Sequence, residues 1–140
     1  MSNPAVGGPL EIRVHHPAPA VVVVRPLGAL DAEAAPQLIT RVEFHLGCGR
    51  HVVIDLQDLG FLGPSGLHAL LELYAVAKAA ALRLYLTGVD GPAIAEALAF
   101  TGLSRVLPVT RLSTEELVAA LTHPLRRDRP AAGVDAIALS

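Results

Sequence analysis

The 140-residue sequence lacks tryptophan, contains a single cysteine, and has only 4% aromatic residues. One cysteine cannot form an internal disulfide, and Cys48, in the loop-like segment GCGR, is typical of a protein in a reducing cytoplasm and is a candidate redox thiol. Charged residues are also few: 11 are basic and 13 are acidic, and together they give a formal net charge of −2. The sequence has no basic stripe with stacking aromatics, so nucleic acid is not an expected partner.

Long hydrophobic runs and a secretion signal are missing as well. The beginning of the chain, MSNPAVGGPLEIRV, lacks the basic start and the apolar stretch of a signal peptide. The apolar run AVVVV at 20–24 is far too short to span a bilayer. We therefore expect a small soluble protein of the cytoplasm, without membrane association, that acts by contacting other proteins.

Hydrophobic residues, by contrast, make up 52% of the chain. A chain of this length buries roughly two-thirds of its unfolded surface, which is enough for a core without disulfides or metals. The periodic segments extend from residue 9 to residue 122. We expect one domain over 9–122, preceded by a flexible N-terminus at 1–8 and followed by a flexible tail at 123–140, where the periodicity ends.

Strands alternate with helices along this domain. The expected strands are 11–15, 21–26, 51–56, 82–89 and a short final one at 106–109. Helices are expected between Pro36 and Leu46, from Ser65 through Lys78, from Pro92 to Gly102, and from a capping box at 113–116 onward. The order β-β-α-β-α-β-α-(β)-α predicts an α/β domain, with a mixed, mostly parallel sheet and helices packed against it.

The segment FLGPSGLHALL at 61–71 places one hydroxyl, Ser65, where a strand region gives way to a helix. Ser65 could cap the helix, act as a nucleophile, or accept a modification. Taken locally, capping is favoured, because serine is a leading N-cap residue. A hydrolase is disfavoured, because a nucleophile elbow needs glycine two residues after the serine and Leu67 stands there. Moreover, a triad needs a positioned histidine and acid, and sequence alone cannot place any of the six histidines beside Ser65.

Metal and cofactor chemistry finds no support in the sequence. His15 and His16 are adjacent on a strand and therefore point to opposite faces. Neither they nor Cys48 belong to a cluster with metal-ligand spacing. The segment TGVDGP at 87–92 follows a strand but has neither the GK[ST] nor the G-x-G-x-x-G pattern of a phosphate loop. We expect no metal, no cofactor and no catalytic residue.

Several motifs in register resemble a STAS domain of the bacterial anti-sigma factor antagonist family. GALDAEAAPQL resembles the G-x-L-D and A-P-x-L entry to the first helix, and HVVIDLQDLGFLGPSGLHALL resembles the V-x-D-L strand followed by F-x-D-S-S-G-L. LRLYLTGV, AIAEALAFTGLSRVLPV and STEELVAAL are similar to the late strand, third helix and closing helix. Together these segments cover about residues 9–122.

The resemblance implies a partner-switching function without catalytic activity. The serine before the glycine is the phosphorylation site in this family, and that position is Ser65. The unphosphorylated antagonist binds an ATP-binding anti-sigma factor serine kinase of histidine-kinase-like fold and so frees a sigma factor, and a serine phosphatase reverses the modification. The implied partner-binding residues are Asp31, Gly63, Pro64, Ser65, Gly66 and His68. Asp31, from the G-x-L-D motif, is expected near the phosphorylation site.

One departure from the family pattern leaves two hypotheses open. The D-S-S-G motif is G-P-S-G here, so Gly63 replaces an aspartate and Pro64 a serine. Either a kinase recognises a different local surface around Ser65, or the protein is a phosphorylation-independent STAS scaffold or ligand-sensing module. A phosphoryl group at a helix N-terminus would meet free backbone N–H groups and the positive end of the helix dipole. Helix initiation and modification are therefore compatible at one residue.

Overall fold

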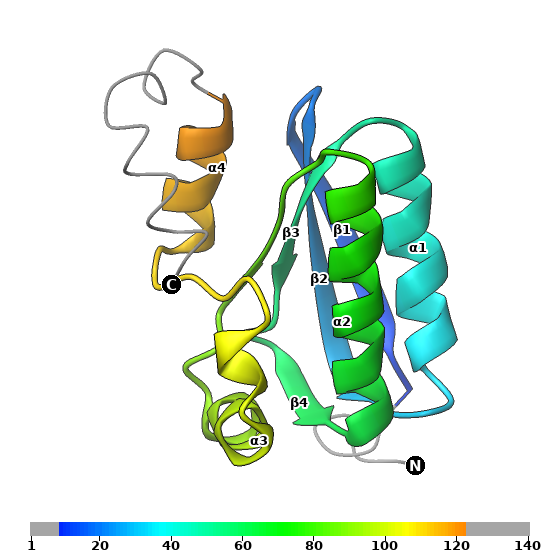
Figure 1. Cartoon of the computed structure of the whole chain (residues 1–140), viewed down its shortest axis with the longest axis vertical. Coiled ribbons are helices and arrows are strands. Elements are labelled where there is room, and N and C mark those ends of the chain that lie inside the picture. Colours follow the sequence, from blue (N-terminus) through cyan, green and yellow to red (C-terminus); the bar gives the residue numbers. More distant parts are fainter. Residues whose placement is uncertain (1–8, 123–140) are drawn as a thin grey trace.

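The computed structural model describes residues 9–122, arranged as a twisted sheet with helices on both of its faces (Figure 1). The strands are β1 (Glu11–Ala18), β2 (Val21–Leu30), β3 (His51–Asp55), β4 (Leu59–Leu62) and β5 (Leu84–Thr87). The main path runs β1-β2-β3-β5, and β4 pairs with the end of β2. The predicted flexible ends at 1–8 and 123–140 lie outside the described residues, so these domain limits stay predictions.

The sheet is mixed and mostly parallel, as predicted. β1 and β2 form the antiparallel hairpin, whereas the pairs β2–β3, β2–β4 and β3–β5 are parallel. The consecutive valines at 21–24 are all buried, because β2 lies between β1 and β3 and is covered on both faces. A strand in this position needs apolar side chains on both of its faces, which explains the unbroken valine run.

Within residues 9–122, four α-helices and one 3₁₀ turn accompany the sheet. They are α1 (Ala35–Gly47), α2 (Pro64–Ala79), α3 (Pro92–Thr101), the 3₁₀ turn η1 (Leu103–Arg105) and α4 (Thr114–Thr122). Proline occupies the first or second position of α1, α2 and α3. Proline is well tolerated there, because its missing N–H would have no partner inside the helix.

The two faces of the sheet bury two separate apolar clusters. In β2, Val22 and Val24 face the larger cluster with α1 and α2, while Val21 and Val23 face the smaller one. Leu117 and Leu121 of α4 complete the smaller cluster. Figure 1 shows α1 and α2 side by side on one face and α4 on the other. The alternation of strand residues thus requires a helix on each side.

The predicted capping chemistry is confirmed at two helix ends. Ser113 Oγ accepts the N–H of Glu116 at 3.1 Å, and the Glu116 carboxylate accepts the N–H of Ser113 at 2.9 Å, which is the reciprocal capping box. Gly102 ends α3 in the left-handed region, with φ of 75°. Glycine adopts that conformation without steric cost.

The strand predictions differ from the structure at two places. β4 was not predicted, and it lies between the third predicted strand and α2. The strand predicted at 106–109 does not form, and Val109 makes only an isolated bridge to Leu86. The N–H of Leu107 instead donates to the carbonyl of Leu103, at 2.8 Å, in the turn that follows η1. Pro108 has no N–H to continue a ladder.

Candidate functional site

Ser65 lies in the first turn of α2, two residues after the N-cap position that local sequence preference assigned to it. The N-cap is Gly63, with extended backbone, and Pro64 holds the first helical position. No side-chain hydrogen bond caps this helix. The interpretation of Ser65 as the N-cap is therefore wrong, and the helix begins through glycine and proline instead.

The Ser65 hydroxyl is available for other chemistry. The side chain is partly exposed, and within residues 9–122 it has no hydrogen-bond partner. The N–H groups of the first helical turn have no partners inside a helix, and here Ser65 and Gly66 contribute two of them. An acceptor group placed on the hydroxyl would lie beside these donors and the positive end of the α2 dipole.

Gly66 allows α2 to approach the end of β2 closely. A Cβ atom at this position would lie 2.6 Å from the carbonyl oxygen of Leu30 and 2.9 Å from Cδ1 of Leu62. These distances are shorter than carbon atoms tolerate in packed interiors, so a larger residue would push the helix outward. The glycine after Ser65 is therefore required by packing, and it lets the start of α2 lie against the end of β2.

Asp31 lies in the turn between β2 and α1. It directly follows Leu30, whose carbonyl accepts the N–H of Gly63 at 3.2 Å. The Asp31 carboxylate accepts the N–H of Ala34 at 2.9 Å and so closes the turn before α1. The residue before α2 is thus hydrogen-bonded to Leu30, the last residue of β2 before the turn that contains Asp31. Asp31 and Ser65 flank it from two different segments of the chain.

An aromatic ring occupies the space beside Gly63. A Cβ atom at Gly63 would lie 2.9 Å from Cε2 of Phe61, so the ring covers the glycine. Phe61 is 45% exposed and lies on β4. A side chain at residue 63 would require this ring to move, which explains in packing terms why glycine fits there. The surface before Ser65 is consequently apolar rather than acidic.

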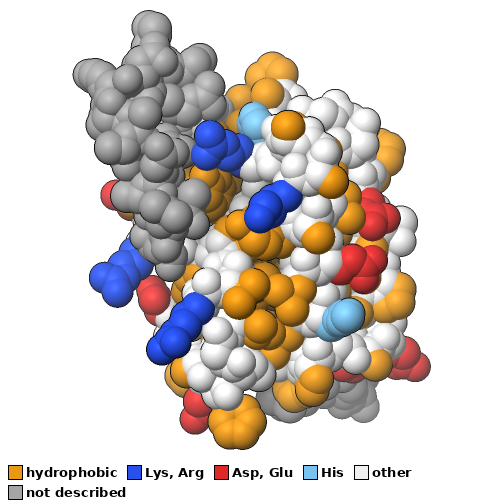
Figure 2. All heavy atoms as spheres, viewed as in Figure 1, with side chains coloured by type: hydrophobic (Ala, Val, Ile, Leu, Met, Phe, Trp, Pro, Cys, Tyr) orange, Lys and Arg blue, Asp and Glu red, His pale blue; other side chains and the backbone are white. Residues whose placement is uncertain are grey.

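The remaining predicted partner-binding residues are exposed around Ser65. Pro64 precedes it, and His68 lies one helical turn further along α2 on the surface. Phe100 of α3 is 92% exposed, and α3 packs against β4. On this side of the molecule, hydrophobic side chains gather between α2 and the segment of α3 and η1 (Figure 2). Sequence reasoning missed Phe61 and Phe100, because exposure cannot be read from an apolar residue type.

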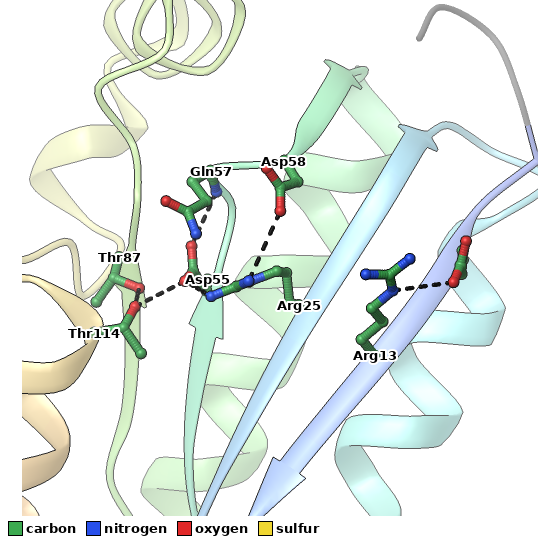
Figure 3. Close-up of polar contacts among 8 residues, drawn as sticks. Arg13, Arg25, Asp55, Gln57, Asp58, Thr87 and Thr114 are labelled. Atoms are coloured by element: carbon green, nitrogen blue, oxygen red, sulfur yellow. Dashed lines mark hydrogen bonds and ion pairs between the residues drawn. The ribbon is translucent and has the colours of Figure 1, made fainter. Parts of the chain in front are cut away.

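A buried polar cluster at the carboxyl end of β3 was also missed (Figure 3). Asp55 accepts hydrogen bonds from Arg25 Nη2 at 2.9 Å, from Thr114 Oγ1 at 2.9 Å and from the Gln57 N–H at 3.0 Å. Because Thr114 donates its proton to the carboxylate, the hydroxyl of Thr87 must donate to Thr114 across 2.7 Å. These contacts tie α4 to the second face of the sheet.

The histidines and the cysteine form no metal site in the part of the chain that the structure describes. His15 and His16 face opposite sides of β1, as predicted: His16 packs edge-on against His45 at 5.5 Å between ring centroids, while His15 lines a groove on the other side. Burial, followed by the nearby charges of Arg50 and other cations, lowers the pKa of His45. Cys48 is exposed.

Among residues 9–122, no helix combines the length and the apolar character needed to cross a membrane. This finding agrees with the absence of long hydrophobic runs in the sequence.

Several solved structures share this fold. An anti-sigma factor antagonist from Mycobacterium paratuberculosis has 24% sequence identity and a TM-score of 0.69, covering 88% of this chain and 100% of its own. The Bacillus cell fate determinant SpoIIAA in its phosphorylated form has 22% identity and a TM-score of 0.62, covering 79% and 99%. Moorella thermoacetica RsbS has 23% identity and a TM-score of 0.66, covering 82% and 97%. These likenesses establish the fold.

The family assignment comes from the sequence. No protein of curated function matches this sequence. The family model described as the STAS domain matches residues 11–117, which spans β1 through the first turn of α4 and includes the turn at Asp31 and the start of α2 at Ser65. This chain belongs to the STAS domain family.

Proposed function

We propose that this protein is an anti-sigma factor antagonist, which binds an anti-sigma factor serine kinase and is released from it when Ser65 is phosphorylated. The observation that carries the proposal is the Ser65 hydroxyl, which is partly exposed and has no partner within residues 9–122, at the start of α2. The resemblance of the fold to antagonists, including SpoIIAA in a phosphorylated form, supports it.

The position of Ser65 suits a modification that changes the surface without unfolding the domain. In the proposed reaction the Ser65 oxygen attacks the γ-phosphorus of ATP held by the kinase, ADP leaves, and the hydroxyl proton passes to a base of the kinase. The new phosphate adds about −1.5 to −2 charge. Backbone donors of the first turn of α2 and the helix dipole would stabilise that charge.

The kinase-binding surface proposed here is built from both segments that meet at Leu30. It comprises Asp31 together with the α2 start, namely Gly63, Pro64, Ser65, Gly66 and His68. Phe61 extends this surface with an apolar contact, since its ring covers Gly63 and is 45% exposed. A charge introduced at Ser65 would need to be desolvated against the partner, so binding should weaken on phosphorylation.

A second function is favoured by one specific observation. Gly63 and Pro64 leave no carboxylate or second hydroxyl directly before Ser65, in contrast to the D-S-S-G pattern. A kinase that requires that carboxylate would not modify this chain. The protein would then be a phosphorylation-independent STAS scaffold or a ligand-sensing module, with the same surface engaged permanently.

The proposed activity is binding in the bacterial cytoplasm, with no catalytic residue in the chain itself. ATP belongs to the kinase, and a serine phosphatase is the second proposed partner, which removes the phosphate from Ser65. We propose neither a nucleic-acid nor a membrane partner. A solvated, weakly acidic surface, with a net charge of −2, gives no electrostatic reason for either.

Mapping the modified residue tests this function. The kinase is first identified by affinity capture with the full chain from native cells, with and without phosphatase treatment. The chain is then incubated with that kinase and ATP, and the site is located by mass spectrometry. We expect phosphate on Ser65 and none on Ser65→Ala. Phosphate elsewhere with Ser65 unmodified would contradict the proposal, and a captured kinase that leaves the chain unmodified would favour the scaffold.

A further inference from the structure

Helix α4 covers only part of the second face of the sheet and leaves a groove beside the β1–β2 hairpin. α4 packs over β2 and β3, where its leucines meet the smaller apolar cluster. Between α4 and β1 lies a cavity of about 560 Å³. That volume falls within the roughly 300–1,000 Å³ typical of small-molecule sites.

Most of the groove is apolar. Val23 of β2 contributes to its lining from the sheet, Val118 and Ala119 from α4, and Pro17 from β1. Val118 is only partly buried in the described residues, although it packs against the smaller cluster. Pro17, Val118 and Ala119 would gain burial from an apolar occupant, at roughly 25 cal/mol for each Å² removed from water.

One end of the groove carries two arginines directly opposite each other. Arg13 of β1 and Arg25 of β2 are register partners in the antiparallel hairpin. Figure 3 shows both side chains on the same side of the two strands. Like charges at opposed positions of neighbouring strands destabilise a sheet. An anion between them would reduce the repulsion that remains beside their ion pairs with Glu11 and Asp55.

The donors of these arginines are incompletely used. Arg25 donates from Nη2 to Asp55 and lies 3.9 Å from Asp58, but its buried Nε has no acceptor among the described residues. Arg13 donates from Nε to Glu11, in a pair that is 65% and 61% exposed. A solvated pair of this kind contributes little to stability and is readily exchanged for another acceptor.

The start of α4 lies at the same end of the groove. Thr114 and Glu115 of its first turn belong to the lining, together with His15 of β1. The capping box satisfies the N–H groups of Ser113 and Glu116 in this first turn. Glu115 is the acidic residue of the lining; Glu11, Asp55 and Asp58, which pair with the two arginines, do not belong to it.

We propose that this groove binds a small aliphatic carboxylate, with its anionic head at Arg13 and Arg25 and its chain along Val23, Val118 and Ala119. A planar guanidinium matches a carboxylate in a bidentate geometry, which favours this head group. The site lies on the face of the sheet opposite α1 and α2, so it is separate from the surface around Ser65. The proposal does not depend on Ser65 phosphorylation.

Titration calorimetry of the full chain with decanoate tests the site, with decanol as the uncharged probe. We expect saturable decanoate binding of one molecule per chain, and binding of decanol at least about tenfold weaker, because a charge-assisted hydrogen bond is lost. Arg13→Gln should weaken decanoate binding by about tenfold. Arg105→Gln removes the same charge from exposed η1 and should leave binding unchanged.

A second variant tests the apolar part of the groove without removing a charge. Ala119→Leu adds side-chain volume to the lining and keeps good helix propensity, so α4 should remain folded while decanoate binding falls. Circular dichroism confirms the fold of each variant. Absent saturation in the wild type, or equal affinity in Arg13→Gln, would overturn the proposal. So would a dimer in sedimentation equilibrium that Ala119→Leu abolishes, because a second copy would then occupy the groove.

Discussion

Replacing Asp55 by asparagine should destabilise the domain strongly, because a buried carboxylate holds α4 to the sheet. The Asp55 side chain is 3% exposed and accepts from Arg25, Thr114 and Gln57 at 2.9–3.0 Å. An asparagine of the same shape turns one acceptor oxygen into a donor, which leaves at least one of these donors facing another donor. The Arg25 charge also loses its close partner.

The expected cost is about 3 kcal/mol of unfolding free energy. Breaking a buried ion pair by removing one partner costs about 3–5 kcal/mol. The lower end applies because the Arg25 side chain is 34% exposed and water can hydrate part of it. Asp58→Asn is the matched control, because it makes the same chemical change in a second partner of Arg25. The Asp58 carboxylate lies 3.9 Å from Arg25 Nη1, and its side chain is 47% exposed. That change should cost less than about 1 kcal/mol.

Urea denaturation of the three proteins, followed by circular dichroism, measures both values. The transition midpoints should separate Asp55→Asn from wild type and Asp58→Asn, with unchanged slopes. Equal free energies of unfolding for the two variants would refute the reasoning, because burial and the Thr114 contact would then contribute nothing.

Two further predictions concern packing and pH. Gly66→Ala should lower the free energy of unfolding by about 1–3 kcal/mol in urea denaturation, because its methyl group would lie 2.6 Å from the Leu30 carbonyl oxygen. Gly47→Ala is the control and should be neutral or stabilising, because the space around Gly47 is open. Similar losses of stability in the two variants would contradict the close approach at Gly66. Burial lowers the pKa of His45 in the folded protein, so at a given pH near 6.5 the unfolded chain binds more protons than the folded one. The free energy of unfolding should therefore fall as the pH drops below about 6.5. His45→Gln should flatten this part of the stability profile and the exposed His68→Gln should not, and an unchanged slope in His45→Gln would count against it.

The sequence predicted the layers of the fold because hydrophobic periodicity is a local property. The valine run at 21–24 and the alternation of helices and strands were enough to indicate a sheet covered on both faces. β4 was missed because Leu59–Leu62 is a short segment with a glycine in it, and its pairing with β2 depends on the tertiary fold.

The start of α2 illustrates a conflict between two local rules. Serine favours an N-cap, and this preference led to Ser65 as the cap. Proline favours the first helical position, and in the structure this preference prevails, so Pro64 starts the helix behind Gly63. Both rules were available in the sequence, but the sequence alone does not rank them.

The polar cluster around Asp55 could not be predicted, because its members are distant in the sequence. Asp55 and Thr114 are 59 residues apart. The V-x-D-L segment and the capping box contain these two residues but do not predict a contact between them, because that contact depends on how α4 returns to the sheet. The same holds for the groove beside α4, whose arginines become neighbours only when β1 and β2 pair.

The most direct test of the central claim, that Ser65 is a switch rather than a structural residue, is the affinity of Ser65→Asp for the captured kinase. A carboxylate in the first turn of α2 should leave stability unchanged or raise it by about 0.3–1 kcal/mol. At the interface a loss of about 2 kcal/mol weakens binding roughly thirtyfold. Titration calorimetry should therefore show wild-type affinity for Ser65→Ala and much weaker binding for Ser65→Asp at an unchanged unfolding temperature. Wild-type affinity in Ser65→Asp would contradict the account.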